Sequence, residues 1–217
     1  MNKINKSFKV RIYPNEEQKV LIDKTFGCAR YVYNFMLNLK QKLYEYHSIS
    51  LSYNHMSKIL TELKKHKVWL REVDKWSLTN AVKDLYFAYQ MLFKGRGFPK
   101  FKSKKRDKNS YRTNSYLFLD QDNKKIRIPK VGWIRFRDKS NFNGLTKINN
   151  ITISKTSSEK YFASISAEVY IPCFERTNQN IGIDLGLKDF CILNDGTMFE
   201  NPLHRGFYQL LTCSSCQ

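Results

Sequence analysis

No stretch of this sequence is long and apolar enough to cross a membrane as a helix, and its longest uncharged runs contain tyrosines and asparagines. The opening residues, MNKINKSFKV, carry lysines with no apolar segment behind them, a pattern that does not predict a secretory signal. Cysteine is scarce: the chain has five, and only Cys213 and Cys216 lie close together. We therefore expect a reduced, cytoplasmic protein rather than a membrane protein or a disulfide scaffold.

Acidic residues are also few. The chain has 19 Asp+Glu against 38 Lys+Arg, which gives a formal net charge of +19 over 217 residues. A positive field of this size suits a polyanion, and nucleic acid is the favoured partner. A generally basic soluble protein and a protein that binds an anionic membrane surface are the alternatives. With 41% hydrophobic residues the chain can bury a core, so it is not broadly disordered.

The first half of the chain has the pattern of one strand followed by helices. Residues 7–13, SFKVRIY, alternate apolar and polar side chains and predict a half-buried strand. Asn15 and Gln18 have the spacing of a capping box, which predicts that a helix begins there. Further helices are predicted to follow Ser52 and Ser77.

After residue 95 the pattern changes to strands separated by turn residues. Strands are predicted at residues 124–129, 133–137, 150–154 and 160–170. One strand therefore precedes the helices and several follow them. This order predicts a small β-barrel or sheet with a helical unit inserted after its first strand.

Between the helices and these strands lies a dense basic run, residues 94–112, with aromatic residues interspersed. Lysines and arginines spaced by aromatics suit a groove that follows a nucleic-acid backbone while bases or sugars stack. Two arginines of the later strand WIRFR are predicted to extend the same surface. The alternative interpretation of the basic run is a solvated charged loop without a binding role. The predicted contacts are Lys94, Arg96, Lys100, Lys102, Lys104, Lys105, Arg106, Lys108, Arg112, Arg135 and Arg137.

A single aspartate interrupts an apolar stretch at residues 181–190, IGIDLGLKDF. Asp184 lies in what we expect to be a buried strand that ends at a turn formed by Gly186. A carboxylate in such a strand can hold Mg²⁺ and, with partner carboxylates, support two-metal phosphodiester cleavage. The same pattern occurs where a glycine turn binds ATP phosphates, and a third interpretation is an aspartate that caps the turn. The position after a basic, β-rich region favours the nuclease over the ATPase.

Near the end of the sequence, Cys213 and Cys216 have the spacing of a zinc knuckle. Zinc needs four ligands, and the sequence contains no second Cys-x-x-Cys pair. We therefore expect a half-site with free thiols that holds little zinc.

Eight blocks of the sequence, taken together and in this order, resemble the TnpB (OrfB) family: KVRIYPNEEQ, FGCARYVYNFML, LSYNHMSKIL, WLREVDKWSL, FPKFKSKK, SYRTN, IPKVGWIRFR and IGIDLGLKDF. The family consists of transposon-encoded proteins, also described as transposases, that are related to type V CRISPR effectors. The resemblance covers roughly residues 5–202 and is more specific than any single motif. It implies RNA-guided DNA binding and cleavage, with guide RNA and target DNA as partners, Mg²⁺ at Asp184, and association with the nucleoid when DNA is bound.

The fold class implied by the resemblance is α+β, which agrees with the order of the predicted elements. It implies a wedge-type, OB-like β-barrel from residues 1–14 and 95–173, with a helical recognition insert at 15–94. Residues 180–203 would be the first strands of a ribonuclease-H-like (RuvC) nuclease domain, and residues 204–217 a tail with half of the family's zinc knuckle.

The sequence departs from the family at the nuclease site. Family members use a glutamate and a second aspartate far downstream of the position that matches Asp184, whereas here only Asp189, Asp195 and Glu200 follow it. These residues fall in the first predicted hairpins. The prediction is a truncated, cleavage-inactive member that binds guide RNA and DNA. A fragment of an active RNA-guided endonuclease, a transposase accessory protein and a non-cleaving DNA-binding repressor are the alternatives.

Overall fold

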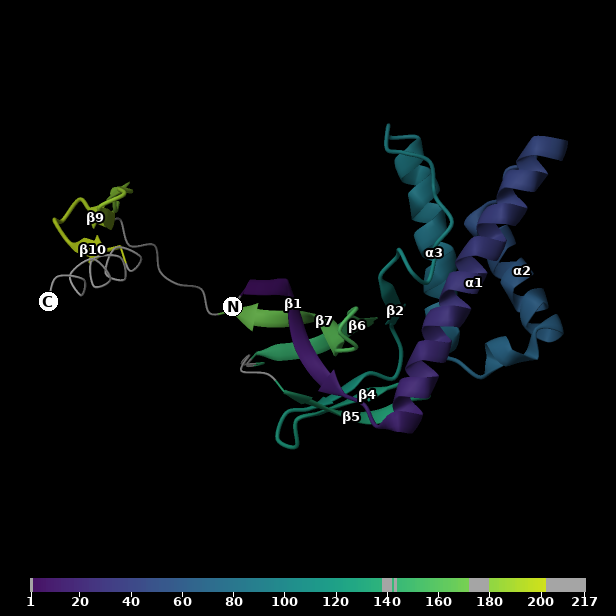
Figure 1. Cartoon of the computed structure of the whole chain (residues 1–217), viewed down its shortest axis with the longest axis horizontal. Coiled ribbons are helices and arrows are strands. Elements are labelled where there is room, and N and C mark those ends of the chain that lie inside the picture. The colour runs from purple at the N-terminus through teal and green to yellow at the C-terminus, as the bar shows by residue number, and fades with distance from the viewer. Residues whose placement is uncertain (1, 138–141, 143, 172–179, 202–217) are drawn as a thin grey trace, which may run out of the picture. The chain divides into compact units, whose positions relative to one another are not determined.

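The computed structural model of the protein describes residues 2–137, 142, 144–171 and 180–201. The chain divides into two units, Met1–Pro172 and Cys173–Gln217. The first contains a helical group and a seven-stranded sheet, and the second a three-stranded sheet (Figure 1).

The helices of the first unit are α1 (Glu16–His47), α2 (Tyr53–His66), the short 3₁₀ helix η1 (Val68–Arg71) and α3 (Lys75–Leu92). The predicted capping box is confirmed: the side chain of Asn15 accepts the Gln18 N–H at 2.8 Å, and the Gln18 side chain accepts the Asn15 N–H at 3.0 Å. Ser52 caps α2 by accepting the N–H of His55, also as expected.

The predicted start of the third helix is wrong by three residues. Helix α3 begins at Lys75 because Asp74, not Ser77, is its N-cap, and the Asp74 carboxylate accepts the N–H of Ser77 at 3.2 Å. The same carboxylate oxygen accepts the hydroxyl hydrogen of Thr113 at 2.7 Å. The buried Asp74 carboxylate therefore caps the start of α3 and also joins this helix to the sheet.

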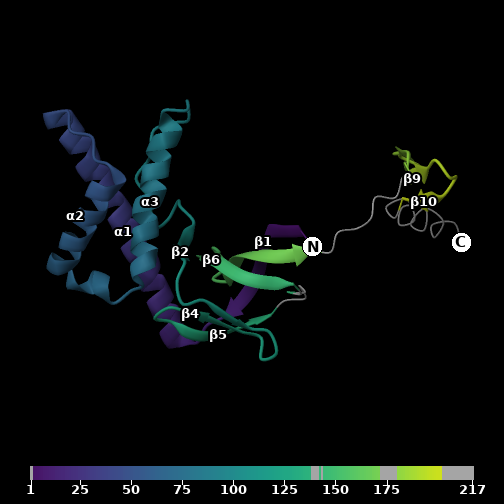
Figure 2. The same cartoon turned by 180° about the vertical axis from the view of Figure 1, so that it is seen from behind.

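The strands of the first unit form one antiparallel sheet in the order β2-β6-β7-β1-β5-β4-β3, which curls beside the helices (Figures 1 and 2). The first strand is central, since it pairs with β7 over Asn2–Ile12 and with β5 over Arg11–Tyr13. The sheet is open, with β2 and β3 at its edges, and an OB-like barrel stays a prediction. The strands are β1 (Asn2–Tyr13), β2 (Asn109–Thr113), β3 (Phe118–Asp120), β4 (Lys125–Ile128), β5 (Gly132–Arg137), β6 (Leu145–Lys155) and β7 (Tyr161–Ile171).

One hydrophobic core joins the helices to one face of this sheet. The alternation predicted for the first strand is confirmed, with Phe8, Val10 and Ile12 all buried. At the other end of the core, the Gln18 amide donates to the carbonyl oxygens of Val131 and Trp133 at 3.2 and 2.9 Å. The start of α1 is therefore tied to the turn between β4 and β5.

The second unit contains β8 (Ile183–Asp184), β9 (Asp189–Leu193) and β10 (Met198–Glu200), in the antiparallel order β10-β9-β8. None of its described residues, 180–201, is buried. The expectation of a buried strand around Asp184 is therefore wrong for the described part of this unit, because three short strands have two faces and no described helix of the unit covers either. The assignment of this unit to a ribonuclease-H-like domain stays a prediction, and Cys213 and Cys216 lie outside the described residues.

Candidate nucleic-acid interface

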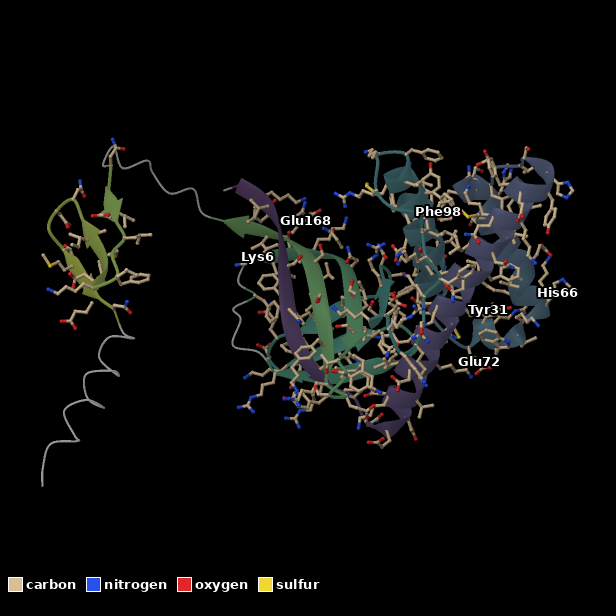
Figure 3. The ribbon with its side chains drawn as sticks, turned by 45° about the horizontal axis from the view of Figure 1, so that its top comes forward. Lys6, Tyr31, His66, Glu72, Phe98 and Glu168 are labelled. Atoms are coloured by element: carbon tan, nitrogen blue, oxygen red, sulfur yellow. The ribbon has the colours of Figure 1, made fainter. Side chains whose placement is uncertain are left out.

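The basic segment, residues 94–108, is a loop whose backbone is held on the helices. The Asn34 side chain of α1 donates to the carbonyl of Lys102 at 2.9 Å and accepts its N–H at 2.8 Å. Pro99 is buried, and Phe98 contacts Tyr89 of α3 edge-on at 5.7 Å between ring centroids (Figure 3). These contacts fix the path of the loop backbone, so its charged side chains project from fixed positions.

Two of the predicted contacts in this region already have internal partners. Lys102 is half-buried with its ammonium 4.1 Å from the centroid of the Tyr33 ring, and burial lowers the pKa of this lysine. Arg112 lies in β2 and pairs with Asp84 at 2.6 Å. The others are exposed to solvent and can meet a phosphate backbone: Lys94, Arg96, Lys100, Lys104, Lys105, Arg106 and Lys108.

Arg135 and Arg137 do not extend the basic segment along the sheet. They lie in β5, which three strands separate from β2, because the sheet order places β6, β7 and β1 between them. Their cross-strand neighbours are cationic or aromatic: Arg137 lies opposite Arg11, and Arg135 lies between Tyr13 and Lys125. A second basic surface is therefore present on the sheet.

We call this surface the cationic sheet face; it consists of Lys9, Arg11, Lys125, Arg127, Arg135 and Arg137. The segments that carry it, residues 9–13, 125–128 and 132–137, contain no acidic residue. Three of its cations lie over aromatic rings, at 5.0 Å for Lys9 on Phe162 and Arg11 on Tyr13, and 5.7 Å for Arg127 on Phe118.

Like charges directly opposite each other on neighbouring strands destabilise a sheet, so this face is suited to a bound polyanion. The cations of β1 and β4 on this face are not among the contacts predicted from the sequence. Their signal was present in the sequence, since Lys9 and Arg11 occupy the polar positions of the predicted first strand.

A third feature, which we call the amide cleft, is a hollow of about 530 Å³ between α2, α3, β2 and β6. The side chains of Asn54 and Asn150 line it without a hydrogen bond to another described residue, whereas Asn80 donates to the Arg112 carbonyl at 2.8 Å. Tyr53 and Lys83 also face it, with the ammonium 6.0 Å from the ring centroid. Amides with free donors and acceptors can recognise base edges, and asparagine matches adenine.

The carboxylates near Asp184 do not form a two-metal site within the part of the chain that is described. Asp184 is exposed, and no group of three or more His, Cys, Asp or Glu residues there could hold a metal ion. Asp195 instead accepts the N–H of Thr197 at 2.9 Å in the β9–β10 turn, and this hydrogen bond lowers the pKa of its carboxyl group. The described residues therefore do not fit the Mg²⁺ pair that the resemblance implies. The Asp184 assignment stays a prediction.

None of the described helices is both long and apolar enough to cross a membrane.

The model of the OrfB/IS605 helix-turn-helix domain matches residues 1–48. In the structure this segment is strand β1 followed by the single uninterrupted helix α1, and the next helix, α2, begins only at Tyr53. The match therefore covers the first strand and first helix of the unit.

Three curated proteins are similar to the chain. "Putative RNA-guided DNA endonuclease InsQ" of Escherichia coli (strain K12) is 32% identical over 199 residues, 89% of this chain and 48% of that protein. "Putative RNA-guided DNA endonuclease" of Streptomyces pristinaespiralis is 28% identical over 94% of this chain and 52% of its own length. "Virulence protein VsdF" of Salmonella dublin is 33% identical over 108 residues, 44% of this chain and 91% of that protein. The chain thus spans about half the length of the first two relatives.

Proposed function

The chain belongs to the TnpB (OrfB) family, and from this membership we propose that it binds guide RNA and DNA through the basic surfaces of its first unit. The observation that carries the proposal is the basic segment: seven exposed lysines and arginines follow one another on a loop that Asn34 and Pro99 hold against the helices. A fixed row of cations suits a fixed row of phosphates better than a freely moving charged loop does, because less conformational freedom is lost on binding.

The test is whether the chain retains RNA when it is purified. Protein expressed together with the DNA that flanks its gene should co-purify with RNA of defined length at low salt and release it in high salt. Sequencing of the released RNA determines whether its length is defined. Protein that purifies free of nucleic acid, and that binds no structured RNA at low salt, would contradict the proposal.

For a polypeptide of these 217 residues we further propose binding without DNA cleavage. The support is the exposed position of Asp184 and the lack of a converging carboxylate cluster in residues 180–201.

We propose that DNA bases are recognised in the amide cleft, which lies on the same unit as the basic segment. Changing Asn54 and Asn150 together to alanine should remove base recognition but leave phosphate contacts intact. Each lost bidentate contact reduces discrimination by about 1–3 kcal/mol, roughly 5- to 150-fold. Selection of RNA-loaded protein on a pool of randomised duplex DNA measures this: the native chain should enrich a short motif, and the variant should lose most of that enrichment.

The matched control is Asn5→Ala with Asn149→Ala, a pair whose side chains contact each other at 3.3 Å between β1 and β6. This control should enrich the same motif as the native chain. If the cleft variant enriches the motif as strongly as the control does, base recognition takes place elsewhere.

A further inference from the structure

A groove of about 650 Å³ lies where η1 and the start of α3 meet the turn between β4 and β5. In both views that turn lies beside the first residues of α1, to which Gln18 ties it (Figures 1 and 2). Leu70, Val73, Ile128 and Pro129 supply apolar walls, and Trp76 and Tyr116 supply two aromatic rings. We call this hollow the Trp76 groove.

The groove is strongly cationic. Five basic side chains line it: Lys64, Arg71, Lys75, Arg127 and Lys130. Its one acidic lining residue, Asp74, is 7% exposed and accepts hydrogen bonds from Ser77 and Thr113, so its charge is used within the fold. Burial, and next the charge of Lys75, lower the pKa of Lys64, which is the effect expected where cations are crowded.

The indole nitrogen of Trp76 is buried and has no hydrogen-bond partner among the described residues. Every other buried side-chain nitrogen or oxygen of the described residues has a partner. A buried donor without a partner costs about 1–3 kcal/mol, so it points to an acceptor that the described part of the chain does not supply. On the rim, the Tyr116 side chain is 73% exposed, and its backbone has φ 54°, a conformation uncommon for tyrosine.

From these features we infer that the Trp76 groove binds an unpaired nucleotide of an RNA strand. The aromatic rings offer stacking surfaces for a base, and the indole N–H can donate a hydrogen bond to an acceptor atom of that base. The five cations can pair with the adjoining phosphates. Arg127 belongs both to this groove and to the cationic sheet face, so a strand that follows the sheet can place one base in the groove. The inference rests on the proposed RNA binding and names a site within it.

Tryptophan fluorescence tests this directly in the full chain. The protein has three tryptophans, so Trp69→Phe with Trp133→Phe leaves Trp76 as the reporter. A ten-nucleotide RNA without self-complementarity should quench its emission by half or more, because a stacked base quenches indole, and the same RNA in a duplex should quench much less. AMP at equal nucleotide concentration should also quench less, since it lacks the neighbouring phosphates.

Binding of the fluorescently labelled strand provides the second measurement. In the otherwise native chain, Trp76→Ala should weaken single-strand binding by about 5- to 150-fold, and Trp76→Phe, which retains a ring but no donor, should weaken it less. Tyr46→Ala, on an exposed tyrosine of α1 outside the groove, should bind as the native chain does.

These two measurements distinguish failure of the nucleotide site from failure of RNA binding in general. RNA that binds the protein without quenching Trp76, or quenching by duplex or AMP that equals quenching by the strand, would overturn the nucleotide site and leave the proposed function standing. If no RNA binds at all, the proposed function fails, and this inference fails with it.

Discussion

Changing Lys100, Lys104, Lys105 and Arg106 together to glutamine should weaken binding to structured RNA by roughly 100-fold or more at 0.15 M salt. All four side chains are exposed on the basic segment, whose backbone is fixed by Asn34. Each lost phosphate contact lowers by about one the number of counterions that are released on binding. A plot of log K against log salt should therefore become less steep by about 3–4 units, which a fluorescence titration at several salt concentrations measures.

Lys102 is left unchanged in this variant because it packs on Tyr33, so its loss would disturb folding as well as charge. The matched control removes the same number of charges from exposed lysines of the helices and their connecting turn: Lys42, Lys58, Lys65 and Lys67. The control should retain most of the affinity and nearly the native salt slope. Equal weakening of both proteins would mean that net charge, and not the basic segment, accounts for binding.

The second large effect concerns cleavage. A polypeptide of these 217 residues, loaded with guide RNA and given a matched target, should not cut DNA above the background rate with Mg²⁺ or Mn²⁺. Two-metal cleavage needs several converging carboxylates, and Asp184 is exposed without such a cluster in the described residues. Asp184→Ala should accordingly leave RNA affinity within about 2-fold, since binding is assigned to the first unit and an exposed side chain contributes little to stability.

A gel assay of end-labelled target DNA decides the point, with Asp122→Ala, an exposed aspartate of the β3–β4 turn, as the control. Cutting by the native chain that disappears in Asp184→Ala but persists in Asp122→Ala would show that a complete metal site assembles, for example between two copies. The proposal of binding without cleavage would then be wrong.

Features that depend on a few neighbouring residues could be predicted from the sequence. The capping box at Asn15, the cap at Ser52 and the alternation in β1 involve hydrogen bonds or spacing within a few positions, and the structure contains all three. The start of α3 was misplaced because Asp74 and Ser77 are both good caps, and the choice between them depends on Thr113, 39 residues away.

Features that depend on the order of strands could not be predicted in the same way. Strand β2 falls inside the basic run, where composition indicates a loop, and it is a strand because β6 pairs with it. The neighbours of Arg135 and Arg137 follow from β5 lying beside β1, a long-range pairing. The Trp76 groove is assembled from residues 64–76, 116 and 127–132, so no local pattern marks it.

The central place of β1 also fixes the order in which the protein can form during synthesis. Its residues Asn2–Ile12 pair with Tyr161–Ile171, so during synthesis β1 waits for about 150 further residues before its main partner exists. At roughly 5–20 residues per second this delay lasts about 8–30 s, during which the helices, whose contacts are more local, can already form. An unpaired strand invites aggregation, and lysines within it are a recognised protection. We expect Lys3, Lys6 and Lys9 to limit aggregation of the unpaired strand during this interval.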